Sequence, residues 1–199
     1  MTKTTISEAA YAAPDEAECL QVLADYGTPP HVVGHCRAVA GVACRLAEAL
    51  NGCGAHLDVE LVRAAGLLHD MARVHEEHWN VGADYCEARG WTREAEIIRK
   101  HMFYDSFHDA EHLDETDLIC LADRLVLEDR YAGIDRRMTY IIEKARKNGH
   151  EEYIPHIERR REETQALLRE IEERIGLPLD ELMADLSGET GNDEDENDR

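Results

Sequence analysis

The sequence predicts an all-α protein, and three observations support this fold class. Alanine, leucine, glutamate and arginine are abundant, whereas only 6% of the residues are aromatic, and the four abundant types are among the best helix formers. Apolar residues recur at steps of three and four, the spacing of a helix with one buried face. Glycine and proline residues separate these periodic stretches. A length of 199 residues fits one domain of ordinary size, with or without a tail.

The first three predicted helices carry several polar residues at informative positions. Helices are predicted, in chain order, at residues 15–26, 30–50, 58–70, 76–89, 92–102, 116–130, 136–148, 155–175 and 178–186. The first ends before Gly27. The second has one apolar face, and His35 lies on that inward face. The third begins at the capping residue Asp58, ends with His69 and Asp70, and is apolar nearly all round, so it should be central.

The later part of the chain alternates apolar and highly charged segments. Thr92 is the expected N-cap of the fifth helix. Residues 102–115 are polar and form a predicted loop that is long enough to be functional. The helix predicted at 155–175 is rich in glutamate and arginine, so most of its surface should face water. Three apolar side chains should dock it on the domain: Leu167, Leu168 and Ile171.

These patterns divide the chain into three parts. Residues 1–14 form an N-terminal lead, residues 15–186 a helical domain whose motifs lie at about 30–140, and residues 187–199 a tail. The tail contains six acids and one arginine and therefore carries −5 of the formal net charge of −21. It lacks apolar residues that could repay the entropy of ordering, so it is predicted to be disordered.

Composition restricts the partners and the compartment. The remaining net charge of about −16 argues against a nucleic-acid polymer, whose phosphates are bound by an excess of lysine and arginine. A small phosphorylated substrate requires only a locally positive site. No apolar run is long enough to span a membrane. Six cysteines without a CxxC pair, and an N-terminus without a secretory signal, predict a cytoplasmic protein whose cysteines are small buried apolar residues.

The sharpest chemical signal is the dipeptide His69-Asp70 at the end of the apolar third helix. An imidazole and a carboxylate in a dry interior are costly unless they are paired or bind a metal. His35 is a second buried ligand source, and Asp123, which follows the apolar run LICLA, is a third. Helical bundles build metal sites from such groups on facing helices, so the sequence predicts a metal site between the central helices.

The order and context of these residues resemble the HD-domain superfamily of metal-dependent phosphohydrolases. The stretches HCRAVAGVACRLAEAL, AAGLLHDMAR and LICLADRLV carry the resemblance, which covers about residues 30–140. It implies a compact HD-type helical bundle. It also implies a metal held by four residues: His35, His69, Asp70 and Asp123.

The resemblance extends to members that bind two metals. These continue with a histidine, a small residue four positions later and another histidine, here His78, Gly82 and His101. The resemblance implies that Asp70 bridges the two metals. The last motif of such modules, ADKLVxxDR, is matched by Ala122, Asp123, Arg124, Leu125, Val126, Asp129 and Arg130. Imidazole and carboxylate ligands suit iron, manganese, zinc, cobalt or nickel, and the sequence does not choose among them.

Two arginines are candidates for binding the substrate phosphate. Arg73 occupies the lysine position of the HDxxK motif, where its guanidinium can donate two hydrogen bonds to a phosphate, and it is assigned a catalytic role with Asp70. Arg130 lies seven residues after Asp123 and therefore on the same face if the helix continues. Arg124 should point away and be solvated. The sequence does not distinguish Arg136 and Arg137 from surface arginines.

Other histidines are weaker candidates. His75 is the rival of His78 for the third histidine of the ligand set. Only two residues separate His75 from His78, so HEEH is not the HExxH zinc-protease motif. His108 and His112 have helical spacing, but their polar, loop-like context favours the surface.

The leading functional hypothesis is hydrolysis of a phosphoester of a small metabolite, in particular a nucleotide, by metal-activated water. Two alternatives remain open. Some HD-fold proteins with the same ligands and two iron ions are oxygenases. A non-catalytic metal-binding signalling module is the other alternative, and the filled ligand positions argue against it, because a site that had lost its activity would tolerate the loss of a ligand. The two arginines and the commoner activity of the superfamily favour the hydrolase. A homodimer is a further possibility that the sequence does not decide.

Overall fold

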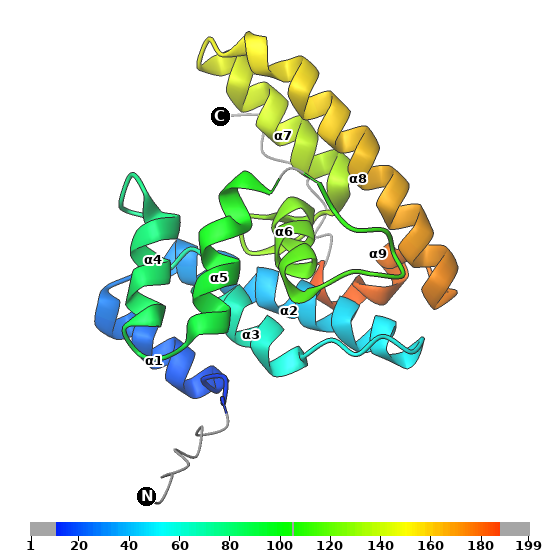
Figure 1. Ribbon diagram of the computed structural model, residues 1–199. Helices are drawn as coiled ribbons and strands as arrows, with labels where there is room; N and C mark the ends of the chain where they lie inside the picture. The colour runs from blue at the N-terminus through cyan, green and yellow to red at the C-terminus, as the bar shows by residue number, and fades with distance from the viewer. Residues whose placement is uncertain (1–10, 105, 188–199) are drawn as a thin grey trace, which may run out of the picture.

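The computed structural model describes residues 11–104 and 106–187, and it confirms the all-α class (Figure 1). The α-helices of the described residues are α1 (Glu16–Tyr26), α2 (Pro30–Gly52), α3 (Val59–Leu68), α4 (His78–Glu87), α5 (Thr92–Lys100), α6 (Glu115–Leu125), α7 (Gly133–Lys147), α8 (Ile154–Ile175) and α9 (Leu179–Leu182). The 3-10 helices are η1 (His101–Phe103), η2 (Glu151–Tyr153) and η3 (Ala184–Leu186). The strands are β1 (Val126–Leu127) and β2 (Arg130–Tyr131), which pair antiparallel.

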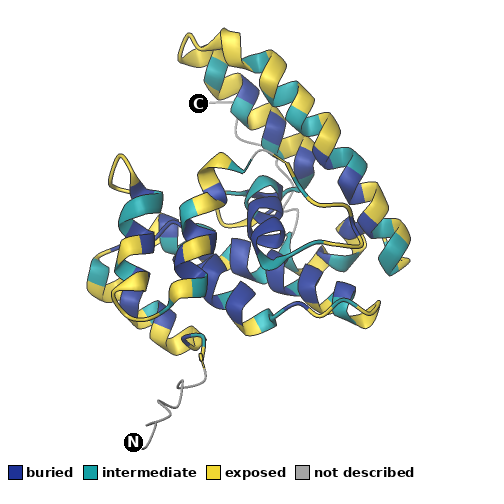
Figure 2. Cartoon of the chain, viewed as in Figure 1, coloured by how far each residue is buried: buried dark blue, intermediate teal, exposed yellow. Residues whose placement is uncertain are grey.

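Helices α2, α3 and α6 form the centre of the fold. Helices α1, α4 and α5 pack on one side of α3, and α7 and α8 form an antiparallel pair on the other side of the molecule (Figure 1). The buried residues concentrate in the central helices, whereas much of the α7–α8 pair faces solvent (Figure 2). The sequence-based expectations of a central, apolar α3 and a charged, solvent-facing α8 are confirmed.

The core has two hydrophobic clusters that share α2 and α3. One joins these helices to α6, α7 and α8, and the other joins them to α1, α4 and α5. The two central helices approach closely at Gly66, where an added Cβ would lie 2.7 Å from the Cα of Ala40. Only glycine fits at this contact, because real Cβ atoms do not approach a backbone atom so closely.

Local signals explain most of the helix boundaries. The Asp58 side chain accepts a hydrogen bond from the Leu61 backbone N–H, as expected of an N-cap. Asp114 and Asp117 form a capping box at the start of α6. The prediction for Thr92 is wrong, because Thr92 already lies within α5 and no side chain caps this helix.

The predicted helix at 116–130 is also wrong in its last five residues. Helix α6 ends at Leu125, and the chain then forms a hairpin in which Val126 pairs with Tyr131 and Glu128 has a φ of 56°. Val126 and Tyr131 are both buried. On a continued helix these residues would point about 140° apart and could not enter the same core, so tertiary packing overrides the helical pattern.

Several other predictions can be compared with the described residues. Five of the six cysteines are buried and Cys53 is exposed, which agrees with their expected role as small apolar residues. No helix among the described residues is both long and apolar enough to cross a membrane. The predicted disordered tail and most of the N-terminal lead lie outside the described residues. The domain boundaries therefore stay predictions.

Candidate metal centre

Four of the predicted ligands converge from the three central helices. His35 lies on α2, His69 and Asp70 directly follow α3, and Asp123 lies on α6. His35 Nε2 is 3.1 Å from Asp123 Oδ1, and His69 Nε2 is 3.8 Å from Asp70 Oδ2. The ring centroids of His35 and His69 are 5.4 Å apart. His35, His69 and Asp70 can each offer one atom to a common metal ion, because these atoms lie within 4.8 Å of one another.

Two further histidines meet Asp70 from its other side. His78 is the first residue of α4, and His101 is the residue that follows α5. His78 Nε2 lies 3.1 Å and His101 Nε2 lies 3.5 Å from Asp70 Oδ1. Asp70, His78 and His101 form a second group whose ligand atoms lie within 4.8 Å of one another, and all three are buried. Asp70 is therefore shared by two groups.

Backbone carbonyls orient three of the imidazole rings. Nδ1 of His69 lies 2.8 Å from the Gly66 carbonyl oxygen, and Nδ1 of His101 lies 2.7 Å from that of Ile98. Nδ1 of His35 lies 3.0 Å from the carbonyl oxygen of Glu128, at the tip of the hairpin. In His69 and His101, an Nδ1–H that donates to a carbonyl leaves the lone pair of Nε2 free, the arrangement found in histidines that bind metals. Nε2 of His35 instead shares a hydrogen bond with Asp123 Oδ1 at 3.1 Å, which a metal would replace.

The unsatisfied atoms of this cluster test whether a metal fits. Within the described part of the chain, His69 Nε2, Asp70 Oδ1 and His101 Nε2 are buried and have no hydrogen-bond partner of acceptable geometry. A buried polar atom without a partner costs about 1–3 kcal/mol. These three atoms belong to the two groups that share Asp70, and nitrogen and carboxylate oxygen are ligands that a divalent transition metal accepts. The residues therefore fit a divalent metal.

The charge states of the cluster suit metal binding. Burial lowers the pKa of His69 to about 4, so its imidazole is neutral. Burial alone would raise the pKa of Asp70, but the neighbouring histidines, His69 first, hold it well below its usual range. Burial likewise opposes ionisation of Asp123, yet the hydrogen bond with His35 lowers the Asp123 pKa and raises that of His35. Both carboxylates are therefore ionised at neutral pH.

Arg73 stands at the solvent edge of the second group. Its Nη1 donates to His78 Nε2 at 3.0 Å and lies 3.5 Å from Asp70 Oδ1, while 46% of the side chain is exposed. Nη1 also lies 4.0 Å from the sulfur of Met102. A guanidinium that is half exposed and touches the ligand cluster can reach a molecule that enters from solvent.

A pocket of about 650 Å³ opens beside the cluster. Its lining residues are Pro30, His31, Val32, Gly34, His35, Asp70, Arg73, Leu127, Glu128, Asp129, Arg130, Arg137, Tyr140, Ile141 and Lys144. Arg130 thus lines this pocket, but not for the predicted reason. Helix α6 ends at Leu125, and Arg130 reaches the pocket from strand β2 of the hairpin. Its Nε lies 3.4 Å from Asp129 Oδ1.

Helix α7 contributes residues that the sequence did not single out. Arg137, Tyr140 and Lys144 line the pocket, whereas Arg136 is exposed elsewhere on the helix. The apolar spacing of α7 could have indicated its inward face, but not which neighbour it meets. The prediction that Arg124 is solvated is wrong: its guanidinium lies 4.5 Å from the centre of the Phe107 ring and donates to a backbone carbonyl.

The three weaker candidates, His75, His108 and His112, are not among the residues that line this pocket. His75 is exposed, and His112 is paired with Asp109 at 2.7 Å on the surface. His108 is also largely exposed, as expected, but its Nδ1 lies 2.8 Å from the fully buried Asp117. The sequence analysis did not single out Asp117.

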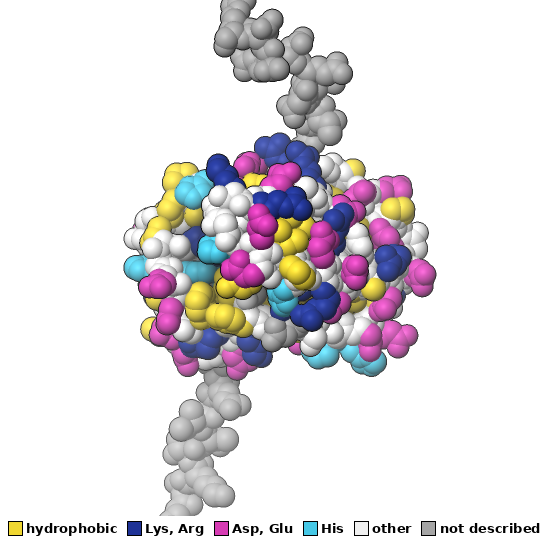
Figure 3. All heavy atoms as spheres, turned by 90° about the horizontal axis from the view of Figure 1, so that it is seen from above, with side chains coloured by type: hydrophobic (Ala, Val, Ile, Leu, Met, Phe, Trp, Pro, Cys, Tyr) yellow, Lys and Arg dark blue, Asp and Glu magenta, His cyan; other side chains and the backbone are white. Residues whose placement is uncertain are grey.

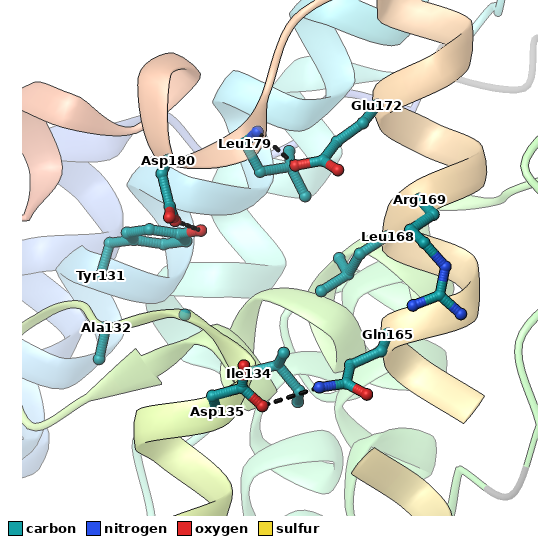
Figure 4. A pocket seen from close by; sticks show the side chains of 11 residues that line it. Tyr131, Ala132, Ile134, Asp135, Gln165, Leu168, Arg169, Glu172, Leu179 and Asp180 are labelled. Atoms are coloured by element: carbon teal, nitrogen blue, oxygen red, sulfur yellow. Dashed lines mark hydrogen bonds between the residues drawn. The ribbon is translucent and has the colours of Figure 1, made fainter. Parts of the chain in front are cut away.

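A second depression lies between α7, α8 and α9 (Figure 4). Its polar side chains already have protein partners: Tyr131 donates to Asp180, and Gln165 donates to Asp135. Glu172 accepts from the Leu179 N–H. None of the six predicted ligands lines this depression, so the chemistry points to the pocket beside Asp70.

The fold and the site together indicate the class of protein. It is a helical bundle in which central helices present histidine and aspartate side chains to a buried metal site. Residues 32–127 match the family model of the HD domain. This segment belongs to the HD-domain superfamily of metal-dependent phosphohydrolases, whose members bind divalent metals.

Three relatives illustrate how this domain is distributed. A tRNA (cytidine(56)-2'-O)-methyltransferase of Thermoplasma volcanium is 34% identical over 93 residues, which are 45% of this chain and 26% of that protein. An uncharacterised protein of Methanocaldococcus jannaschii is 42% identical over 71 residues, 34% of this chain and 42% of that protein. A ribonuclease Y of Wolinella succinogenes is 31% identical over 111 residues, 53% of this chain and 19% of that protein. The chain thus spans less than half the length of each relative. No solved structure matches it significantly.

Proposed function

We propose that this protein is a phosphohydrolase that cleaves a phosphoester of a small metabolite, in particular a nucleotide, and that it holds two divalent metal ions. One observation supports this most directly. Two groups of ligand atoms share Asp70, and three of the buried atoms lack partners: Nε2 of His69, Oδ1 of Asp70 and Nε2 of His101. His35, His69, Asp70 and Asp123 would hold one ion. The other would bind Asp70 together with His78 and His101.

The residues of the chain divide the work between ligation and substrate binding. Bound divalent ions would supply Lewis acidity, which lowers the pKa of water and offsets charge on phosphoryl oxygens. The carbonyls that accept from His35, His69 and His101 keep each Nε2 directed at the centre. If His78 Nε2 bound a metal, its hydrogen bond with Arg73 would break, and the guanidinium of Arg73 would be available to a phosphoryl oxygen. Arg130 would hold the substrate at the hairpin side of the pocket.

Charge and size favour a small substrate over a nucleic-acid polymer. A pocket of about 650 Å³ is in the range of sites for small ligands. On the face shown in Figure 3, acidic, basic and hydrophobic side chains are intermixed, without a continuous basic band. The net charge of −21 would repel a polymer of phosphates, although two of the relatives have names that refer to RNA. We therefore keep the small metabolite as the proposed substrate.

The test combines metal analysis with a substrate panel. The purified protein is analysed for metals, then assayed with nucleotides, p-nitrophenyl phosphate and bis(p-nitrophenyl) phosphate, with and without Mn²⁺. We expect metal-dependent turnover, which Arg73→Ala lowers about 10²-fold in kcat/KM because it removes one charge-stabilising donor. Arg136→Ala, which removes an exposed arginine outside the pocket, is the matched control and should leave turnover unchanged.

Two results would overturn the proposal. Absence of turnover with every metal and substrate would exclude the phosphohydrolase activity and favour a signalling module. Activity that requires Fe²⁺ and dioxygen would replace hydrolysis by oxygenase chemistry, which the same ligand types can support.

A further inference from the structure

We propose that the pocket beside the metal centre selects a small molecule with two separated anionic groups, one held at the metal end and one held at Lys144. The proposal rests on the proposed function and specifies its substrate class. A nucleoside that carries phosphates at two positions is one molecule of this kind. The argument depends on one face of α7, on the partners of its cations and on their spacing.

One face of α7 forms a wall of the pocket. Arg137, Tyr140, Ile141 and Lys144 all line it, and they follow one another at the three- and four-residue steps of a single helix face. Arg137 is at the inner end, where its charge helps to lower the pKa of Asp123. Lys144 is exposed and stands at the outer end. Between them, Tyr140 and Ile141 offer an aromatic and an apolar surface.

Neither cation of this wall forms an ion pair within the described residues, and Arg137 acts on Asp123 only from a greater distance. The Nε of Arg137 is buried and makes no hydrogen bond, and within the described residues the ammonium group of Lys144 takes part in no ion pair and no hydrogen bond. Other arginines of this acidic protein are paired, as Arg161 is with Asp135 of the same helix at 2.7 Å. A buried guanidinium nitrogen without an acceptor is costly, and an anion in the pocket would satisfy it.

The carboxylates that line the pocket do not neutralise this wall. Asp70 belongs to the metal centre, and Asp129 is paired with Arg130 on the hairpin. Glu128 lies at the hairpin tip and its backbone carbonyl accepts from His35. The pocket therefore has cationic groups at its metal end, in Arg73 and Arg137, and another at its outer end, in Lys144.

The spacing of these groups sets the size of the ligand. Seven residues separate Arg137 from Lys144, which is about 10 Å along a helix. One anionic group of the ligand is thus expected near the metal centre and Arg73. A second anionic group, about 10 Å away, is within reach of the flexible side chain of Lys144. The part of the ligand between them would contact Tyr140 and Ile141, which suits a sugar and base or another partly apolar group.

Two inert probes test the second anionic site without relying on turnover. Hexylphosphonate and hexane-1,6-bisphosphonate share an apolar chain, contain no hydrolysable ester and differ only by the second phosphonate. Their affinities for the protein as purified are measured by isothermal titration calorimetry. We expect the bisphosphonate to bind about tenfold more tightly, because a charge-assisted contact to Lys144 adds to the shared one.

Variants of α7 locate the effect. Lys144→Gln should abolish the tenfold difference and leave hexylphosphonate binding unchanged. Lys147→Gln makes the same charge change on the same helix outside the pocket and should have no effect. Arg137→Gln should weaken both probes, with folding checked by circular dichroism.

Equal affinities of the two probes for the unchanged protein would overturn the proposal, as would an equal loss in Lys144→Gln and Lys147→Gln. Failure of both probes to bind would also overturn it. These outcomes are separate from failure of the proposed function, since the probes contain no hydrolysable ester and hydrolysis of p-nitrophenyl phosphate by the unchanged protein is measured independently.

Discussion

Asp70 and Asp117 are both buried aspartates at the ends of central helices, but their surroundings are opposite. Asp117 accepts hydrogen bonds from the Tyr104 hydroxyl, from the N–H of Asp114, and from both the backbone N–H and Nδ1 of His108. Every one of these donors belongs to the protein. Asp70 Oδ1 instead faces imidazole nitrogens without a hydrogen bond of acceptable geometry.

This difference separates a structural carboxylate from a functional one. Burial alone does not, because both side chains are at least nine-tenths buried. A carboxylate whose acceptor sites are filled by protein donors contributes to stability and has little left to offer a metal. A carboxylate with an unsatisfied oxygen among histidines is stable only with a further partner. His108, Asp114 and Asp117 also lie close enough to share an ion, but the donors already occupy Asp117.

The largest expected effect distinguishes the two aspartates by metal content and activity. Asp70→Asn removes the anionic ligand that both groups share, so we expect loss of bound metal and a fall in turnover of at least about 10³-fold. Asp117→Asn should leave both the metal content and the turnover per folded molecule unchanged. Metal content by mass spectrometry and the phosphoester assay measure the two variants side by side. Equal metal loss in both would show that the comparison is mistaken.

For stability we expect a smaller effect and the opposite order, with Asp117→Asn losing more than Asp70→Asn. In Asp117→Asn an NH₂ group replaces an acceptor among four donors, so at least one buried donor loses its partner. We expect the free energy of unfolding to fall by about 1–3 kcal/mol. Urea unfolding is measured with EDTA present, so that metal binding does not contribute. Asp70→Asn should destabilise the metal-free protein less, and a larger loss for Asp70→Asn would contradict the assignment.

The smallest effect is the pH dependence of the His108–Asp117 pair. The hydrogen bond to Asp117 raises the pKa of His108 above its ordinary value of 6.5. The stabilisation is therefore fully present below about pH 6.5 and is lost as the pH rises through the folded-state pKa. His108→Gln should lower the urea midpoint at about pH 5.5 and change it much less at about pH 9. A pH-independent difference would mean that the imidazolium charge contributes nothing.

The sequence predicted the centre better than its surroundings. His35, His69, Asp70 and Asp123 were identifiable because each is polar within or next to an apolar helical segment, and helical periodicity then places them inward. The structure brings these four residues together with His78 and His101. Whether they bind one metal or two stays a prediction.

The features that were missed depend on contacts between distant segments. The hairpin after α6 exists because Val126 and Tyr131 enter one core together, which a local pattern cannot indicate. Asp117 looks like an ordinary helix-start acid until Tyr104 and His108 are seen to donate to it. Similarly, choosing Arg137 over Arg136 requires knowing which side of α7 meets the pocket.

Gly66 narrows the range of mutations that the metal centre tolerates. A single added methyl group there would meet the Ala40 Cα at 2.7 Å and push α2 away from α3. His35 is carried by α2, and His69 follows α3 and is oriented by the Gly66 carbonyl. The spacing between the ligand-bearing helices is thus set partly by a missing side chain. A substitution of Gly66, which offers no ligand side chain, would thus disturb the centre, so more positions are sensitive to mutation than the number of ligands suggests.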